Sequence, residues 1–338
     1  MEWFEHYHWI NKAISQLDPE TQYEEIFRLM SSYRLSDFMN NLIYAVTFPN
    51  FILDEWGSEA VWREDGGKMI EKATRRLEET ENNNMVWWYY GPSHERTKKS
   101  VEDINKRHEF WASKYPGNFS HNDDYIYVLA FSAVLMDRFL RRLGLHGFSE
   151  KEKIAAHHFW RDMMPLFYAE GRTPLYGFPA DWDEMMKLCI EYEQTPKKFP
   201  PKGRAIAMSI YEEFAFRYFP PGFRWLGRRI PLALSLDSTL ATLHIEAPNV
   251  ILSWLITIFF SWMMWFTGTF LPEPKKAFIV ELEGASPAEK KARREHLIKT
   301  DKSYSSYIAR QYGGSFSGCP INRMRSTPEL PPGMEKFS

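Results

Sequence analysis

Residues 250–271, VILSWLITIFFSWMMWFTGTFL, constrain the fold more than any other part of the chain, because they carry no charge over 22 positions. A helix needs about 20 such residues to cross the hydrocarbon core of a bilayer. The Trp and Phe residues of the segment are typical of side chains at a membrane interface. We expect a membrane-contacting helix that either spans the bilayer or lies in its interface. A helix wholly buried in a soluble core is the alternative that its composition leaves open.

The flanks of this segment predict its orientation. Lys275, Lys276 and the later run EKKARREHLIKTDK make the C-terminal side basic. If the segment spans the bilayer, this excess of Lys and Arg places the C-terminal side in the cytoplasm. The opening MEWFEHYHWINKAISQLDPE is charged and aromatic, so it lacks the positive and apolar regions of a signal peptide.

Helical periodicity runs through the rest of the chain, and no alternating strand pattern is longer than four residues. We therefore expect an all-α fold with a single helical bundle domain over 1–275. The tail over 276–338 is first basic and then rich in Pro and Gly, and we expect it to be irregular from about 303. Three asparagines, Asn82, Asn83 and Asn84, are expected to break a helix. The predicted helices cover 19–46, 66–80, 93–115, 120–144, 149–167, 179–194 and 202–219.

Capping residues predict where several of these helices begin. Asp18 before Pro19 is a typical N-cap followed by proline at the first helical position. Ser93 begins a similar pattern. Ser149 with Glu152 three residues later predicts a capping box.

Composition excludes several classes of function. A formal net charge of −2 provides no basic field for binding nucleic acid. The two cysteines, Cys189 and Cys319, form neither a disulfide framework nor a CxxC zinc pattern. No HExxH, Walker loop, dinucleotide-binding GxGxxG or GxSxG pattern is present. Hydrophobic residues make up 44% of the chain, which is ample for a large core.

His108 differs from the other histidines in its surroundings. Helical spacing places it on one stripe with Val101, Ile104 and Trp111, so the imidazole points where its helix packs. The next segment, YIYVLAFSAVLM, is apolar nearly all round and is expected to be central. A histidine directed at such a helix is either a hydrogen-bonded core residue or a ligand to something large and apolar.

Other polar features have simpler explanations. His157 and His158 are adjacent, so they point in different directions and do not share a metal easily. Arg76 and Thr80 lie one turn apart on one helix face, which is ordinarily solvated.

A set of short motifs occurs here in a characteristic order. LDPET is followed by Arg-x-x-x-Thr from Arg76 to Thr80, by Tyr90–Gly91, and by Asn-x-x-His from Asn105 to His108. The segments HNDDYIYVLAFSAVLMDRFLRRLGL, FSEKEK, YGFPADWDEM and FPPGFRWLGRRIPLALSL follow. Over roughly residues 17–270 this pattern resembles the DUF2236 family, the haem-dependent oxygenase fold of rubber-cleaving latex-clearing proteins. It is more similar still to the fungal membrane-bound branch, which includes the oxygenase that cleaves the farnesyl chain in mycophenolic acid biosynthesis.

The resemblance implies a haem b inside the helical bundle, with His108 as the ligand to iron and dioxygen as co-substrate. Trp111, on the stripe of His108, would pack the porphyrin. Asn105, one turn before His108, would lie near the haem edge or cap a neighbouring chain segment.

The same resemblance implies the catalytic residues. Arg76 and Thr80 would donate hydrogen bonds to negative charge that develops on oxygen. Glu59 is the approximate match for an upstream acidic residue proposed as a base in the family, with Glu55 nearby. Rubber-cleaving members have a lysine immediately before the threonine, whereas this chain has Glu79.

The expected function is therefore a haem-dependent oxygenase that acts on an apolar prenyl or terpenoid substrate. The resemblance implies a location in the endoplasmic reticulum membrane and oxidative cleavage of a C=C bond. Hydroxylation, peroxygenation and rearrangement are alternative haem reactions. A non-catalytic, membrane-associated helical protein that binds a lipid or terpenoid is the alternative function. A metal enzyme built on Asp123, Asp124 and Asp137 is a third, although adjacent acids point apart.

Overall fold

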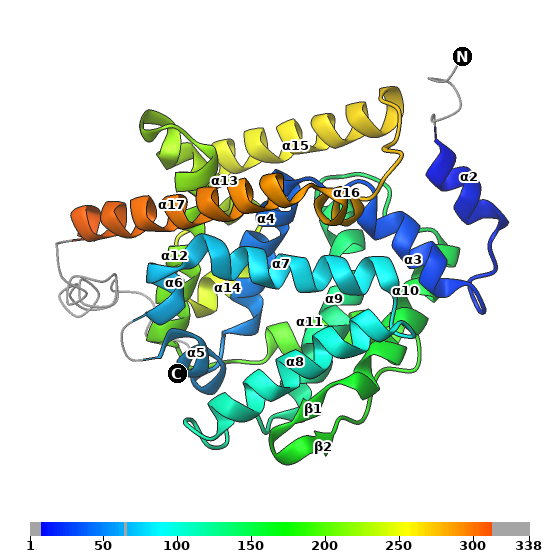
Figure 1. Ribbon diagram of the computed structural model, residues 1–338, viewed down its shortest axis with the longest axis horizontal. Coiled ribbons are helices and arrows are strands. Elements are labelled where there is room, and N and C mark those ends of the chain that lie inside the picture. Colours follow the sequence, from blue (N-terminus) through cyan, green and yellow to red (C-terminus); the bar gives the residue numbers. More distant parts are fainter. Residues whose placement is uncertain (1–7, 64–65, 313–338) are drawn as a thin grey trace.

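Almost all regular structure in this chain is helical (Figure 1), which confirms the predicted all-α fold. The computed structural model describes residues 8–63 and 66–312. Within these ranges the only strands are β1 (Tyr168–Ala169) and β2 (Thr173–Pro174), which pair antiparallel in a short hairpin. Cys189 is buried, and Cys319 lies outside the described residues.

The helices follow one another along the chain with short connections. In chain order the α-helices are α2 (Trp9–Gln16), α3 (Tyr23–Ser32), α4 (Asp37–Thr47), α5 (Glu55–Trp62), α6 (Gly67–Glu71), α7 (Ala73–Tyr90), α8 (Glu95–Ala112), α9 (Asn122–Arg142), α10 (Glu150–Met163), α11 (Trp182–Gln194), α12 (Pro201–Tyr218), α13 (Arg224–Leu234), α14 (Asp237–Thr242), α15 (Val250–Phe270), α16 (Phe278–Gly284) and α17 (Pro287–Tyr312). Short 3-10 helices are η1 (Phe48–Phe51), η2 (Met164–Leu166), η3 (Glu170–Arg172) and η4 (Pro221–Phe223).

Two helices run through the centre of the molecule. In α9, Tyr127 and Val134 are almost fully buried, which confirms that this apolar segment is central. In α12, Ile206 and Phe214 are buried as well. Because α9 packs against α10 and α11, and α12 packs against α4, α5 and α13, the two helices organise adjoining parts of the core.

The capping predictions have mixed outcomes. The capping box at the start of α10 is confirmed, because Ser149 N donates to Glu152 Oε2 over 2.8 Å and Ser149 Oγ accepts from the backbone of Glu152. The prediction for Ser93 is wrong by one residue. His94 caps α8 through Nδ1, which accepts from the backbone N–H of Arg96 at 3.1 Å, while Ser93 binds Glu24.

The predicted helix over 19–46 is divided in two. Asp18 stabilises a turn before α3, where its carboxylate accepts hydrogen bonds from Glu20 N and Thr21 Oγ1, and it does not cap a helix. A break over 33–36 follows α3, and Ser36 caps the new helix α4 by accepting from Met39 N at 3.2 Å.

The expected break at Asn82–Asn84 is wrong, because α7 runs without interruption from Ala73 to Tyr90. The buried side chains of Met85 and Trp87 bind this part of the helix to the core. Asn83 contributes by accepting a hydrogen bond from Ser100 of α8 at 3.0 Å. Tertiary contacts therefore outweigh the weak helix preference of asparagine.

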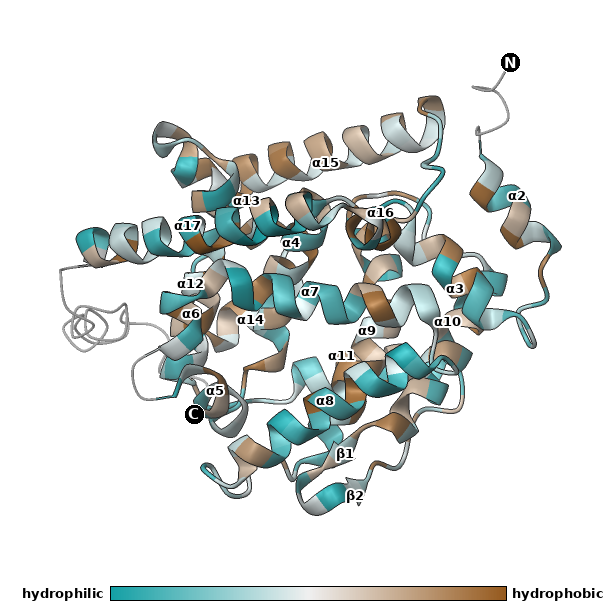
Figure 2. Ribbon diagram, viewed as in Figure 1, coloured by the Kyte–Doolittle hydropathy of each residue, from teal (hydrophilic) through white to brown (hydrophobic). Residues whose placement is uncertain are grey.

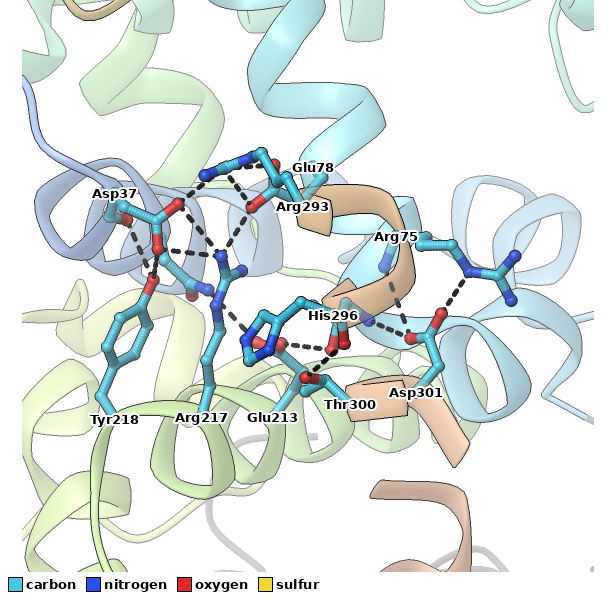
Figure 3. A network of polar contacts seen from close by, with 12 residues as sticks. Asp37, Arg75, Glu78, Glu213, Arg217, Tyr218, Arg293, His296, Thr300 and Asp301 are labelled. Carbon is cyan, nitrogen blue, oxygen red and sulfur yellow. Dashed lines mark hydrogen bonds and ion pairs between the residues drawn. The ribbon is translucent and has the colours of Figure 1, made fainter. Parts of the chain in front are cut away.

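The helical body continues past residue 275, where the sequence indicated a tail. α17 packs against α6, α7 and α12, and its Tyr304 and Asp301 are almost fully buried. Asp301 accepts a hydrogen bond from the backbone N–H of Thr74 at 2.9 Å and pairs with Arg75 (Figure 3). A carboxylate from α17 thus caps the N-terminus of α7, which has no cap of its own. The part of the predicted tail over 313–338 lies outside the described residues.

The uncharged segment predicted over 250–271 forms α15, which is long and apolar enough to cross a membrane. Figures 1 and 2 show this hydrophobic helix along one edge of the molecule. Within α15 only Ile256 and Phe260 are buried, and the helix packs against α13. A wholly buried core helix is therefore excluded. The large exposed side chains are Val250, Ile251, Trp254, Leu255, Ile258, Phe259, Trp262, Trp265, Phe266 and Phe270.

Candidate functional site

A cavity of about 330 Å³ lies between α4, α7, α8 and α9. This volume is within the range of pockets that bind small molecules. Its walls are mainly aromatic and aliphatic, as expected for a site that binds an apolar ligand. The aromatic lining residues are Tyr44, Phe48, Phe51, Trp56, Trp87, Trp88, Phe119, Tyr125, Trp160 and Phe167.

His108 projects from α8 into this cavity. Its Nδ1 lies 3.3 Å from the phenol oxygen of Tyr125, and its ring centroid lies 4.9 Å from that of Phe119. Burial lowers the pKa of His108 to about 4, and the charge of Arg107 acts in the same direction. The imidazole is therefore neutral at pH 7.

Only one nitrogen of His108 is occupied by a protein partner. Within the described ranges Tyr125 is the hydrogen-bond partner of Nδ1, and no hydrogen bond engages Nε2. When the proton is on Nδ1, this nitrogen donates to Tyr125 and Nε2 keeps its lone pair. The residue can therefore serve as a neutral nitrogen ligand from the cavity wall.

Asn105 and Trp111, the other two residues expected near a cofactor, do not line the cavity. Asn105 is buried, and its Nδ2 donates to the carbonyl of Leu166 at 2.8 Å. It therefore takes the second role expected for it, capping a neighbouring segment, and this segment carries Phe167 into the cavity. The ring of Trp111 lies under the guanidinium of Arg63, 3.6 Å from its carbon.

Thr80 lines the cavity, and Arg76 lies just behind the wall. The guanidinium of Arg76 donates to the phenol oxygen of Tyr44 and sits 4.7 Å from the ring centroid of Phe48, both of which line the cavity. The hydroxyl of Thr80 donates to the carbonyl of Arg76 at 3.1 Å. Burial raises the pKa of Tyr44, so this phenol stays protonated beside Arg76.

Glu59 on α5 lies outside the cavity lining. Its carboxylate accepts hydrogen bonds from Lys202 Nζ at 2.7 Å and from Asn118 Nδ2 at 3.3 Å. The bond from Lys202 is the main reason that the pKa of Glu59 is lowered. Glu59 reaches the cavity only through Asn118, which does line it.

Among the cavity residues that sequence reasoning missed are Tyr44, Tyr125, Asn40 and Glu81. Tyr125 could have been found, because it follows His108 on the apolar helix that was predicted to be central. Asn40 and Glu81 are 2% and 3% exposed, but polar residues within MNN and TENNN give no local signal of burial.

The other histidines and acids considered in the sequence have protein partners, and Asp124 among them also lines the cavity. His157 contacts the carbonyl of Pro179 at 3.0 Å, and His158 contacts Glu20 at 2.7 Å. Asp124 accepts hydrogen bonds from Trp56 and Tyr192, both at 2.6 Å. Asp137 accepts from the backbone of Phe148 at 2.7 Å and from Arg141 at 2.8 Å. Among the described residues no three His, Cys, Asp or Glu side chains gather as a metal site.

No protein-family model matches the sequence, and no curated protein is significantly similar to it.

Proposed function

We propose that the protein is a haem b-dependent oxygenase that uses dioxygen to oxidise an apolar prenyl or terpenoid substrate, by cleavage of a C=C bond. The observation that carries this proposal is the neutral imidazole of His108 at the wall of an aromatic cavity. The Asn-x-x-His motif of the DUF2236 family points to the same residue.

The chemistry of the residues fits a haem. A histidine that ligates a metal usually has its other ring nitrogen held by a hydrogen bond, and Tyr125 provides one at Nδ1 of His108. The aromatic walls suit the faces of a porphyrin. When bound, haem would supply the redox chemistry through which dioxygen attacks an alkene.

Tyr44, supported by Arg76, would stabilise developing negative charge, whereas the hydroxyl of Thr80 already donates to the carbonyl of Arg76. The phenol of Tyr44 faces the cavity and is held by the guanidinium of Arg76, so its proton is oriented by a fixed positive charge. Preorganised donors of this kind commonly raise kcat by roughly 10²–10³. Arg76→Ala is therefore expected to keep a normal haem spectrum and to lose most turnover. Equal loss of haem and turnover would contradict this assignment.

A second cavity, next to the first, would give a membrane-derived substrate a route from α15. It has a volume of about 680 Å³ and includes Met264 of α15 in its lining. It shares Ile43, Trp88, Ser132 and Leu135 with the walls of the first cavity. We propose that the exposed apolar side chains of α15 contact a membrane, as the endoplasmic reticulum location implied by the resemblance requires.

An absorbance spectrum of the detergent-purified protein, with a pyridine haemochrome assay for stoichiometry, tests the proposal. A Soret band with about one haem b per chain is expected if His108 is the residue that would hold the iron. A protein that stays colourless after expression with added haem precursor would overturn the proposal. A non-catalytic protein that binds a lipid or terpenoid in the same cavity would then be the better account.

A further inference from the structure

Besides the indole of Trp160, the cavity contains two buried polar side chains with atoms that lack a hydrogen-bond partner in the described part of the chain. They are Nδ2 of Asn40 on α4 and Oε1 of Glu81 on α7. Both side chains line the cavity and are at most 3% exposed. Folded proteins rarely leave buried polar atoms unpaired, and exceptions commonly mark a place for a ligand or water. The cavity is the place from which a ligand or a water can supply the missing partner.

The two side chains enter the cavity from adjacent walls. α4 and α7 pack directly against each other. Asn41, next to Asn40, donates to Glu213 of α12 at 3.3 Å, and Thr74 of α7 donates to the same carboxyl at 2.9 Å. This arrangement holds both helices to α12, so the positions of Asn40 and Glu81 are set by buried contacts rather than by surface loops.

Charged groups around Glu81 favour its neutral form. Burial raises the pKa of Glu81 well above its usual value, and Glu78, Asp37 and Glu213 act in the same direction. Arg217 opposes them, but its Nη2 donates to Glu78 at 2.6 Å and to Asp37 at 2.8 Å (Figure 3). A protonated carboxyl has one O–H donor and one carbonyl acceptor.

We infer that Asn40 and Glu81 form a polar subsite that binds a neutral oxygen group, a hydroxyl or a carbonyl, on an otherwise apolar ligand. Asn40 Nδ2 donates to this oxygen, and the carboxyl of Glu81 donates to it or accepts from its hydroxyl. An anionic group is disfavoured because Glu78, Asp37 and Glu213 surround this wall. The inference rests on the proposed function in that it takes the cavity as the substrate site.

Binding of three probes with a similar C15 prenyl chain tests the subsite: farnesol carries a hydroxyl, farnesyl methyl ether carries an ether, and farnesene carries no oxygen. Equilibrium dialysis against the full-length, detergent-purified protein gives each affinity, and haem content is recorded separately. We expect farnesol to bind roughly tenfold more tightly than farnesene, as one good net hydrogen bond allows. The ether, which only accepts, is expected to lie between them.

Variants assign this preference to the two side chains. Asn40→Leu and Glu81→Met should bring the farnesol-to-farnesene ratio close to one, whereas Glu81→Gln, which keeps a donor and an acceptor, should retain it. Ser132→Ala is the matched control, because Ser132 also lines the cavity but its hydroxyl already donates to Val128 at 2.7 Å. A farnesol-to-farnesene ratio that stays at the wild-type value in both apolar variants would overturn the subsite. Equal affinities of the wild type for farnesol and farnesene would also overturn it, and this measurement does not require that the variants fold.

The two proposals fail in different ways. A colourless protein that prefers farnesol would overturn the oxygenase and support the subsite. A protein with one haem and equal affinities for all three probes would overturn the subsite and support the oxygenase.

Discussion

The phenol oxygen of Tyr125 lies 3.3 Å from Nδ1 of His108, and this contact joins α9 to α8 at the cavity wall. It sets His108 apart from His157, whose Nε2 contacts the carbonyl of Pro179. His108 lines the cavity, whereas His157 does not, and the imidazole of His157 instead connects α10 to the segment before α11.

Of His108, His157 and His158, we expect that only the replacement of His108 removes the haem. His108→Ala is expected to abolish the Soret band, because it removes the nitrogen ligand at the cavity. His157→Ala and His158→Ala should keep about one haem per chain, measured by pyridine haemochrome, since these rings have partners outside the cavity. If His108→Ala bound haem as well as the wild type, the ligand would have to be another residue.

Stability of the haem-free protein should fall in mild acid because of His108. Its folded-state pKa is lowered to about 4, while an unfolded histidine titrates near 6.5. Between these values the unfolded chain binds a proton that the folded chain does not, so stability is full above about pH 6.5 and is lost as the pH falls toward 4. The loss is at most about 3 kcal/mol, since one pKa unit corresponds to about 1.4 kcal/mol.

Urea unfolding at pH 7.5 and pH 5 measures this loss. His108→Phe should reduce the difference in unfolding free energy between the two pH values, because it removes the titrating group. His296→Gln, at an exposed position on α17, is the control and should leave the difference as in the wild type. An identical pH dependence in His108→Phe would refute the assignment.

Charge on the outer face of α15 should weaken membrane binding. Phe259 and Trp262 are 56% and 55% exposed, so a Phe259→Asp and Trp262→Asp double variant should fold normally and lose most of its flotation with phospholipid vesicles. Phe110→Asp provides the matched control, because Phe110 is 56% exposed on α8. Full flotation of the double variant would show that another surface contacts the membrane.

Arg217 should be among the most costly single charges to remove. It pairs with Asp37 and Glu78, and its side chain is 11% exposed. Arg217→Met leaves the partly buried carboxylates of Asp37 and Glu78 with Arg293 as their remaining ion-pair partner. The cost in unfolding free energy is therefore expected above about 1 kcal/mol but below the about 3–5 kcal/mol of an uncompensated buried charge. Arg172→Met, which breaks the half-exposed pair with Glu102, should cost less than about 1 kcal/mol. Urea denaturation of both variants compares the two costs, and similar values would contradict the network in Figure 3.

Features that depend on neighbouring residues were predictable. The capping box of Ser149 and Glu152 depends on a spacing of three residues, and it forms as predicted. The uncharged segment over 250–271 gives the helix α15 with one residue of difference. The prediction that one stripe of α8 faces the interior is confirmed for Val101, Ile104 and His108.

Features that depend on distant residues were not predictable. Nothing within TENNN indicates that the helix continues, because the contact that supports Asn83 comes from Ser100 on α8. The basic composition of α17 gave no sign that Tyr304 is buried against Ser209 on α12. For Glu81, burial results from the packing of α4 against α7, which no local pattern describes.

The cap that Asp301 places on α7 has a consequence for the production of this protein. Helix α7 brings Thr80 and Glu81 to the cavity. In its first turn, the backbone N–H of Thr74 donates to Asp301, which lies 227 residues later in the chain. Expression of residues 1–275 alone, the segment that sequence patterns favour as a domain, would leave Thr74 N–H and Arg75 without their carboxylate. Crystallographic or kinetic measurements on such a truncation would describe a cavity whose α7 wall has lost its N-terminal cap. A modification of α17 that moved Asp301 away from α7 would change ligand binding even though Asp301 does not contact the ligand.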